Sequence, residues 1–96
     1  METIKLSEQE IINSICSLIS EQEQVHISEI AVELMYEDDE GYSAEAEIST
    51  RTIFLTEARM IEAIRAWLQT QYAIDPFSTS LQLELDDEEG IIAYAK

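Results

Sequence analysis

The amino-acid sequence predicts an α+β protein built as an internal duplication of a β-α-β-β unit. Two observations carry this prediction: apolar residues follow strand and helix spacings in turn, and the whole pattern returns 49 residues later, as from Gly41 to Gly90. The chain has 96 residues, the size of one domain, and its 46% of hydrophobic residues suffice for one core. We therefore expect a single domain, residues 1–96, made of two pseudo-symmetric halves, residues 1–49 and 50–96.

The internal repeat rests on identities between residues 3–47 and residues 52–96. At a constant offset, 13 of these 45 pairs are identical, whereas roughly two to four would be expected by chance at this composition. The identities gather before the predicted helices and around Gly41 and Gly90. The two halves are therefore expected to share one local structure.

Each half is expected to begin with a short strand that leads into a helix of about four turns. Ser7 is the expected N-cap of the first helix, with Glu10 at the capping-box position, and Thr56 takes the equivalent place in the second half. Apolar residues then recur at a spacing of 3.6. They are Ile11, Ile12, Ile15, Cys16, Leu18 and Ile19 in the first half and Met60, Ile61, Ile64, Trp67, Leu68 and Tyr72 in the second.

Each helix is followed by an expected β-hairpin with an acidic tip. Residues 30–36 and 81–85 alternate between apolar and polar side chains, as strands do. The tips, residues 37–41 and 86–90, end in Gly41 and Gly90, which are the two glycines of the protein and supply the positive φ of a bulged turn. The predicted assembly is one mostly antiparallel sheet of up to six strands with the two helices packed on one face.

The charge balance excludes several classes of function. There are 21 Asp and Glu residues against five Lys and Arg residues, a net charge of −16, and contact with phosphates needs clustered cations. Direct binding to nucleic acid or to an anionic membrane is therefore not expected. The sequence carries no catalytic motif and no Gly-rich phosphate loop, so we expect neither enzymatic activity nor a cofactor.

The sequence favours a cytoplasmic location. No apolar run is long enough for a secretory signal or a membrane span. Cys16, the one cysteine, cannot form an internal disulfide and is expected to be a buried small hydrophobic residue. His26, the one histidine, is expected to have a structural role in the loop that follows the first helix.

The acidic tips are candidates for a weak divalent-cation site because clustered carboxylates are the ligands that Ca²⁺ and Mg²⁺ prefer. The spacing matches no EF-hand loop, and a solvated surface turn is the favoured interpretation. The candidate ligands are Asp38, Asp39, Glu40, Asp87, Glu88 and Glu89.

Alternation along the strands also predicts a candidate interaction surface. It directs Phe54, Ile92 and Tyr94 away from the helices, with Met35 as a candidate fourth member. A contiguous apolar patch on a soluble protein usually has a partner. The same pattern would arise if a loop or the C-terminus covered this face, so both explanations stay open.

The sequence resembles the YxcD-like family of small acidic bacterial proteins. The resemblance covers nearly the whole chain and is carried by residues 32–39 (VELMYEDD), 61–65 (IEAIR) and 83–94 (LELDDEEGIIAY). It implies a cytoplasmic protein of a spore-forming type of Gram-positive bacterium, and it brings no activity, cofactor or site residue with it.

These observations lead to a non-enzymatic interaction protein that forms a homodimer or binds another protein through the surface around Phe54, Ile92 and Tyr94. One alternative is an acidic mimic that binds the basic surface of a nucleic-acid-binding protein, because the net charge is −16. A second alternative is weak divalent-cation binding at the hairpin tips.

Overall fold

A computed structural model describes residues 3–75 and 77–96 of the chain and confirms the α+β class. Two helices and six strands follow one another in the predicted order, and a 3₁₀ turn that was not predicted follows the first helix. They are β1 (Ile4–Leu6), α1 (Glu8–Glu23), η1 (Ile27–Glu29), β2 (Ala31–Glu37), β3 (Gly41–Ile48), β4 (Arg51–Thr56), α2 (Glu57–Tyr72), β5 (Leu81–Asp86) and β6 (Gly90–Ala95).

The strands form two antiparallel sheets of three strands, so the prediction of one common sheet is wrong. Sheet A has the order β1-β6-β5 and sheet B the order β2-β3-β4. The reason is that each lead strand pairs with the return strand of a hairpin from the other half: β1 with β6, and β4 with β3. Each hairpin thereby gains its third strand, and the described strands have no hydrogen-bonded ladder from one sheet to the other.

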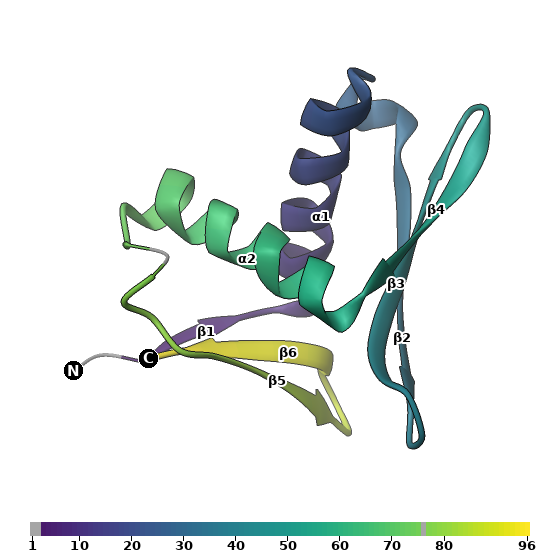
Figure 1. Ribbon diagram of the computed structural model, residues 1–96. Coiled ribbons are helices and arrows are strands. Elements are labelled where there is room, and N and C mark those ends of the chain that lie inside the picture. Colours follow the sequence, from purple (N-terminus) through teal and green to yellow (C-terminus); the bar gives the residue numbers. More distant parts are fainter. Residues whose placement is uncertain (1–2, 76) are drawn as a thin grey trace.

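The two helices lie in the angle between the sheets rather than on one face of a single sheet (Figure 1). Sheet B stands beside α1, while sheet A runs below both helices in this view. Helix α1 contacts strands of both sheets, α2 contacts β3 and β4, and the helices contact each other. The core therefore fills the space that the two helices and the two sheets enclose.

The lead strands have the same register in the two sheets. Leu6 of β1 lies opposite Ala93 of β6, and Leu55 of β4 lies opposite Ala44 of β3. Two residues earlier on each lead strand, Ile4 lies opposite Ala95 and Ile53 lies opposite Ala46. All four alanines are buried, so a small side chain repeatedly leaves room for a large apolar neighbour or a helix.

Both helices begin at the predicted residues. Ser7 accepts a hydrogen bond from the Glu10 amide (3.2 Å), and Thr56 accepts one from the Arg59 amide (3.4 Å), so each helix has a side-chain N-cap. The Glu10 carboxylate, predicted to complete a capping box, instead accepts hydrogen bonds from Trp67 Nε1 (3.2 Å) and the Tyr72 hydroxyl (2.7 Å) of α2. It therefore joins the two helices, and its hydrogen bond raises the pKa of Tyr72.

The core is one cluster to which both helices and both sheets contribute. Cys16 is half-buried rather than fully buried, and burial raises the pKa of its thiol. Among the residues that the structure describes, no helix combines the length and apolarity needed to cross a membrane. The buried hydrophobic residues of the cluster are Leu6, Ile11, Ile15, Ile19, Ala44, Ala46, Leu55, Met60, Ala63, Ile64, Leu68, Leu83, Ile91, Ala93 and Ala95.

Candidate functional site

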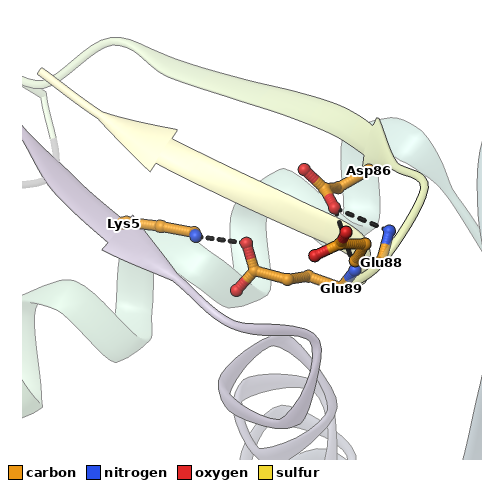
Figure 2. Close-up of polar contacts among 4 residues, drawn as sticks. All are labelled: Lys5, Asp86, Glu88 and Glu89. Carbon is orange, nitrogen blue, oxygen red and sulfur yellow. Dashed lines mark hydrogen bonds and ion pairs between the residues drawn. The ribbon is translucent and has the colours of Figure 1, made fainter.

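The tip of the β5–β6 hairpin is organised by its own polar groups (Figure 2). The Asp86 carboxylate accepts hydrogen bonds from the amides of Glu89 (2.9 Å) and Glu88 (2.8 Å), which together hold the pKa of Asp86 below its usual range. Lys5 of β1 forms an ion pair with Glu89, and this contact raises the pKa of Lys5. The acidic tip of sheet A is thus paired with a cation from a strand of the same sheet.

Both hairpins are also held by a glutamate from the first turn of a helix. Glu8 of α1 accepts a hydrogen bond from the Ile91 amide (3.0 Å), and Glu57 of α2 accepts one from the Tyr42 amide (3.3 Å). These contacts cross between the halves, because α1 holds the β5–β6 hairpin and α2 holds the β2–β3 hairpin. Glutamate suits the first turn because the helix dipole favours negative charge there.

The two tip glycines are required both by their backbone angles and by these glutamates. Gly41 and Gly90 have φ values of +77° and +78°, in the region that favours glycine. A Cβ atom on Gly90 would lie 2.3 Å from Glu8 Oε2, and one on Gly41 would lie 3.0 Å from Glu57 Oε1. Glycine therefore lets a helix N-terminus approach each hairpin closely.

The structure does not bring the six candidate cation ligands together. They lie on two tips that belong to different sheets, and all six side chains are exposed. Glu89 is already paired with Lys5. Within residues 3–75 and 77–96, no three His, Cys, Asp or Glu side chains are grouped so that they could hold a metal ion. The ligands named from the sequence were Asp38, Asp39, Glu40, Asp87, Glu88 and Glu89.

The four candidate interaction residues are divided between the two sheets. Phe54 is 60% exposed on β4 and Met35 is half-buried on β2, both in sheet B. Ile92 and Tyr94 lie on β6 of sheet A, where Ile92 is only 2% exposed and Tyr94 is half-buried. The prediction that Ile92 lies on an exposed surface is wrong, and β2 of the other sheet contacts β6. Phe54 remains as the exposed aromatic residue of the set.

The outer face of sheet B, turned away from the helices, is strongly acidic. Val32, Ala44 and Ala46 pack in the core, so alternation directs Glu33, Glu45 and Glu47 outward, and all three are exposed. Glu33 lies directly opposite Glu45, which in turn lies opposite Phe54. We call Glu33, Glu45, Glu47, Met35 and Phe54 the acidic sheet face.

Four of the five Lys and Arg side chains have a partner away from the acidic sheet face. Arg51 forms an ion pair with Glu23, Arg59 with Glu62, and Lys5 with Glu89. Arg65 donates a hydrogen bond to the carbonyl oxygen of Thr79 (2.8 Å), and Lys96 follows β6 in sheet A. Among the ion pairs of the residues that the structure describes, none involves Glu33, Glu45 or Glu47.

Two hollows border the acidic sheet face. The larger, about 350 Å³, is lined by Glu40, Tyr42, Ser43, Phe54, Thr56 and Glu57, and we call it the Phe54 hollow. The smaller, about 210 Å³, is lined by Ala31, Val32, Glu33, Glu45 and Glu47. Partial burial, reinforced by Tyr36, Glu57 and Glu84, raises the pKa of Tyr42. Carboxylates beside aromatic rings suit the binding of a cationic group.

His26 caps the 3₁₀ turn η1 through its ring and its backbone amide. His26 Nδ1 accepts a hydrogen bond from the Ser28 amide (3.2 Å) and lies 2.7 Å from Ser28 Oγ, while the Glu29 carboxylate accepts a hydrogen bond from the His26 amide (3.1 Å). These contacts cap η1. Glu29 is bonded to the backbone rather than to the imidazole ring, so the three residues do not form a relay in which a carboxylate orients a histidine base.

Sequence reasoning did not identify Glu8, Glu57 or the pairing of Lys5 with Glu89. The signal for the two glutamates was present, because Glu8 and Glu57 match in the internal repeat just as Gly41 and Gly90 do. The Phe54 hollow had no sequence signal, since its six lining residues come from a hairpin turn, two strands and the start of a helix.

Comparisons with known proteins assign the chain to a family. Residues 1–88 match the model of the family described as "Protein of unknown function (DUF2653)". The "Uncharacterized protein YxcD" of Bacillus subtilis (strain 168) is 32% identical over 89 residues, which cover 92% of this chain and 87% of that protein. No solved structure matches the chain. The resemblance seen in the sequence is thereby confirmed, and the chain belongs to the DUF2653 family, whose function is unknown.

Proposed function

We propose that this protein is a non-enzymatic, cytoplasmic interaction protein that binds the basic surface of another protein through the acidic sheet face. Such basic surfaces are typical of nucleic-acid-binding proteins, so the chain would act as an acidic mimic. The observation that carries the proposal is the direct opposition of Glu33 and Glu45 on an exposed sheet face. Like charges placed opposite each other across two strands destabilise a sheet, and a cationic partner would relieve this repulsion.

The apolar members of the acidic sheet face support contact with a protein rather than with small ions. Phe54, 60% exposed, lies on β4 opposite Glu45, and Met35 lies on β2 opposite Ser43. Exposed aromatic residues and methionine are typical of protein interfaces. A surface that combines these side chains with glutamates fits a partner that presents both cations and apolar groups.

Homodimerisation through the same surface is disfavoured by charge. Two copies would bring together two chains of net charge −16 with glutamates facing glutamates. A homodimer would meet less charge repulsion on the outer face of sheet A, where Lys5, Tyr94 and Gln82 lie in one row. The solution mass, which is 11.0 kDa for one copy, distinguishes a homodimer from a monomer that keeps both faces open.

We also propose that the chain is an internal duplication. The equal registers of Leu6 with Ala93 and of Leu55 with Ala44 support this proposal. The equivalent contacts of Glu8 and Glu57 with the two hairpins support it too. The identities of the sequence repeat therefore fall on positions that also have matching structural roles.

The test of the proposed function compares two triple variants with the same net charge. Glu33→Gln, Glu45→Gln and Glu47→Gln remove the charges of the acidic sheet face. The control, Glu21→Gln, Asp87→Asn and Glu88→Gln, removes three exposed charges elsewhere. Fluorescence anisotropy measures the binding of a labelled peptide of alternating arginine and serine. Because each exposed ion pair contributes up to about 1 kcal/mol, we expect the first variant to bind roughly tenfold to hundredfold more weakly.

The control variant should bind nearly as well as the unaltered chain, and the affinity of both should fall as salt is added. Equal losses in the two triple variants would mean that the peptide responds only to net charge, and the proposed surface would then be wrong. Circular dichroism of both variants verifies that the fold is retained.

A further inference from the structure

The two sheets differ in one respect that points to an external ligand. In sheet A, Lys5 lies beside Leu6 on the lead strand and pairs with Glu89, which precedes Gly90 at the hairpin tip (Figure 2). In sheet B the same places are taken by Phe54, beside Leu55, and by Glu40, which precedes Gly41. Sheet A therefore has a cation paired with its tip glutamate, whereas sheet B has an aromatic ring in place of that cation.

A hollow lies beside the tip of sheet B, where Phe54 takes the place of Lys5. Phe54 and Glu40 both line the Phe54 hollow of about 350 Å³, together with Tyr42 and Glu57. Glu57 is held in place by the Tyr42 amide, which donates to its Oε1 atom (3.3 Å). Where sheet A has Ile92 buried on the return strand, sheet B has the small side chain of Ser43, another residue of the hollow. The hollow thus combines two carboxylates with an exposed aromatic ring.

We propose that the Phe54 hollow binds an arginine side chain of the basic partner protein, which supplies from outside the cation that Lys5 supplies within sheet A. This proposal rests on the proposed function and names the chemistry of one contact within it. The guanidinium group would stack on the Phe54 ring and donate hydrogen bonds to the carboxylates of Glu40 and Glu57.

Arginine fits this hollow better than lysine or a metal ion. Its planar guanidinium group stacks on aromatic rings and forms paired hydrogen bonds with carboxylates, whereas an ammonium group is a compact and strongly hydrated charge. A metal ion would make no use of the Phe54 ring. A volume of about 350 Å³ is at the lower end of the range for ligand pockets, which suits a single side chain.

The experiment uses a short peptide with one arginine and the same peptide with citrulline, its neutral isostere. NMR follows the amide signals of Ser43, Phe54 and Thr56 in the full chain. We expect the arginine peptide to shift these signals and the citrulline peptide to bind about tenfold more weakly. Equal shifts with the two peptides would overturn the proposal.

A variant that fills the hollow provides a second test, and a variant with the same added charge elsewhere provides its matched control. Phe54→Lys places an ammonium group where sheet A has Lys5, so it should pair with Glu40 and abolish arginine binding. Gln69→Lys adds the same charge on the exposed side of α2 and should leave binding unchanged. Because Phe54 is largely exposed, the first variant is expected to fold. Retained binding in Phe54→Lys would contradict the proposal.

The outcomes separate this inference from the proposed function. If the arginine–serine peptide distinguishes the two triple variants but the single-arginine peptide leaves the hollow signals unchanged, only the present inference fails. If the two triple variants bind that peptide equally well, the acidic sheet face is wrong as the contact surface.

Discussion

Replacement of Ile15 or Ile64 by alanine is expected to lower the free energy of unfolding by about 3 kcal/mol in each case. Both side chains have no solvent exposure and belong to the single core cluster, Ile15 from α1 and Ile64 from α2. Truncation removes buried methylene and methyl groups and leaves a cavity in a close-packed interior. Since small domains have a total stability of about 5 to 15 kcal/mol, each loss is a large share.

Denaturant unfolding measures this effect with two probes. Trp67 is the one tryptophan and reports on α2, whereas far-ultraviolet circular dichroism reports on both helices. If the chain is one cooperative domain, Ile15→Ala moves the Trp67 transition as far as Ile64→Ala does. If the denaturant midpoint followed by Trp67 were unchanged in Ile15→Ala, the two halves would unfold independently. Ile27→Ala, at a residue that is 48% exposed, is the control with a small expected effect.

Replacement of Gly90 by alanine is expected to lower the free energy of unfolding by about 2 to 3 kcal/mol. An alanine with φ near +78° is strained, and its Cβ would lie 2.3 Å from Glu8 Oε2. The flexible Glu8 side chain can move aside, but it then loses its hydrogen bond with the Ile91 amide. The strain and the lost hydrogen bond add.

Gly41→Ala is the matched control because Gly41 has nearly the same φ, +77°, and its Cβ would approach Glu57 less closely, at 3.0 Å. Its loss of stability in thermal unfolding should therefore be smaller than that of Gly90→Ala. Glu8→Ala removes the hydrogen bond and the favourable charge at the helix N-terminus without straining the backbone, and it should cost about 1 to 2 kcal/mol. Equal losses at the two glycines would contradict the role given to the Glu8 contact.

Most individual elements could be predicted from the sequence because their signals are local. Ser7 and Thr56 cap the helices as expected, and Gly41 and Gly90 close the two hairpins with positive φ. The assembly of the sheets could not be predicted in this way. Whether β1 pairs with its own hairpin or with that of the other half depends on contacts between distant residues, and the same alternation fits both arrangements.

Only part of the candidate interaction surface could be predicted, because alternation along a strand is also a local signal. Alternation correctly directs Phe54 outward, and Phe54 is exposed. Ile92 also faces away from the core cluster that holds Ala93, yet it is buried, and β2 of the other sheet contacts its strand. Local periodicity reports on which side of a strand a residue lies, and it carries no information about what other parts of the fold cover that side.

The most direct test of the central claim is to locate a bound basic peptide on the chain. A spin-labelled peptide of alternating arginine and serine broadens the NMR amide signals of nearby residues. We predict that the broadening is strongest at the acidic sheet face, at Glu33, Glu45 and Phe54, and that added salt removes it. Broadening centred on the tips at residues 86–90, or spread evenly over the chain, would contradict the assignment of this face as the contact surface.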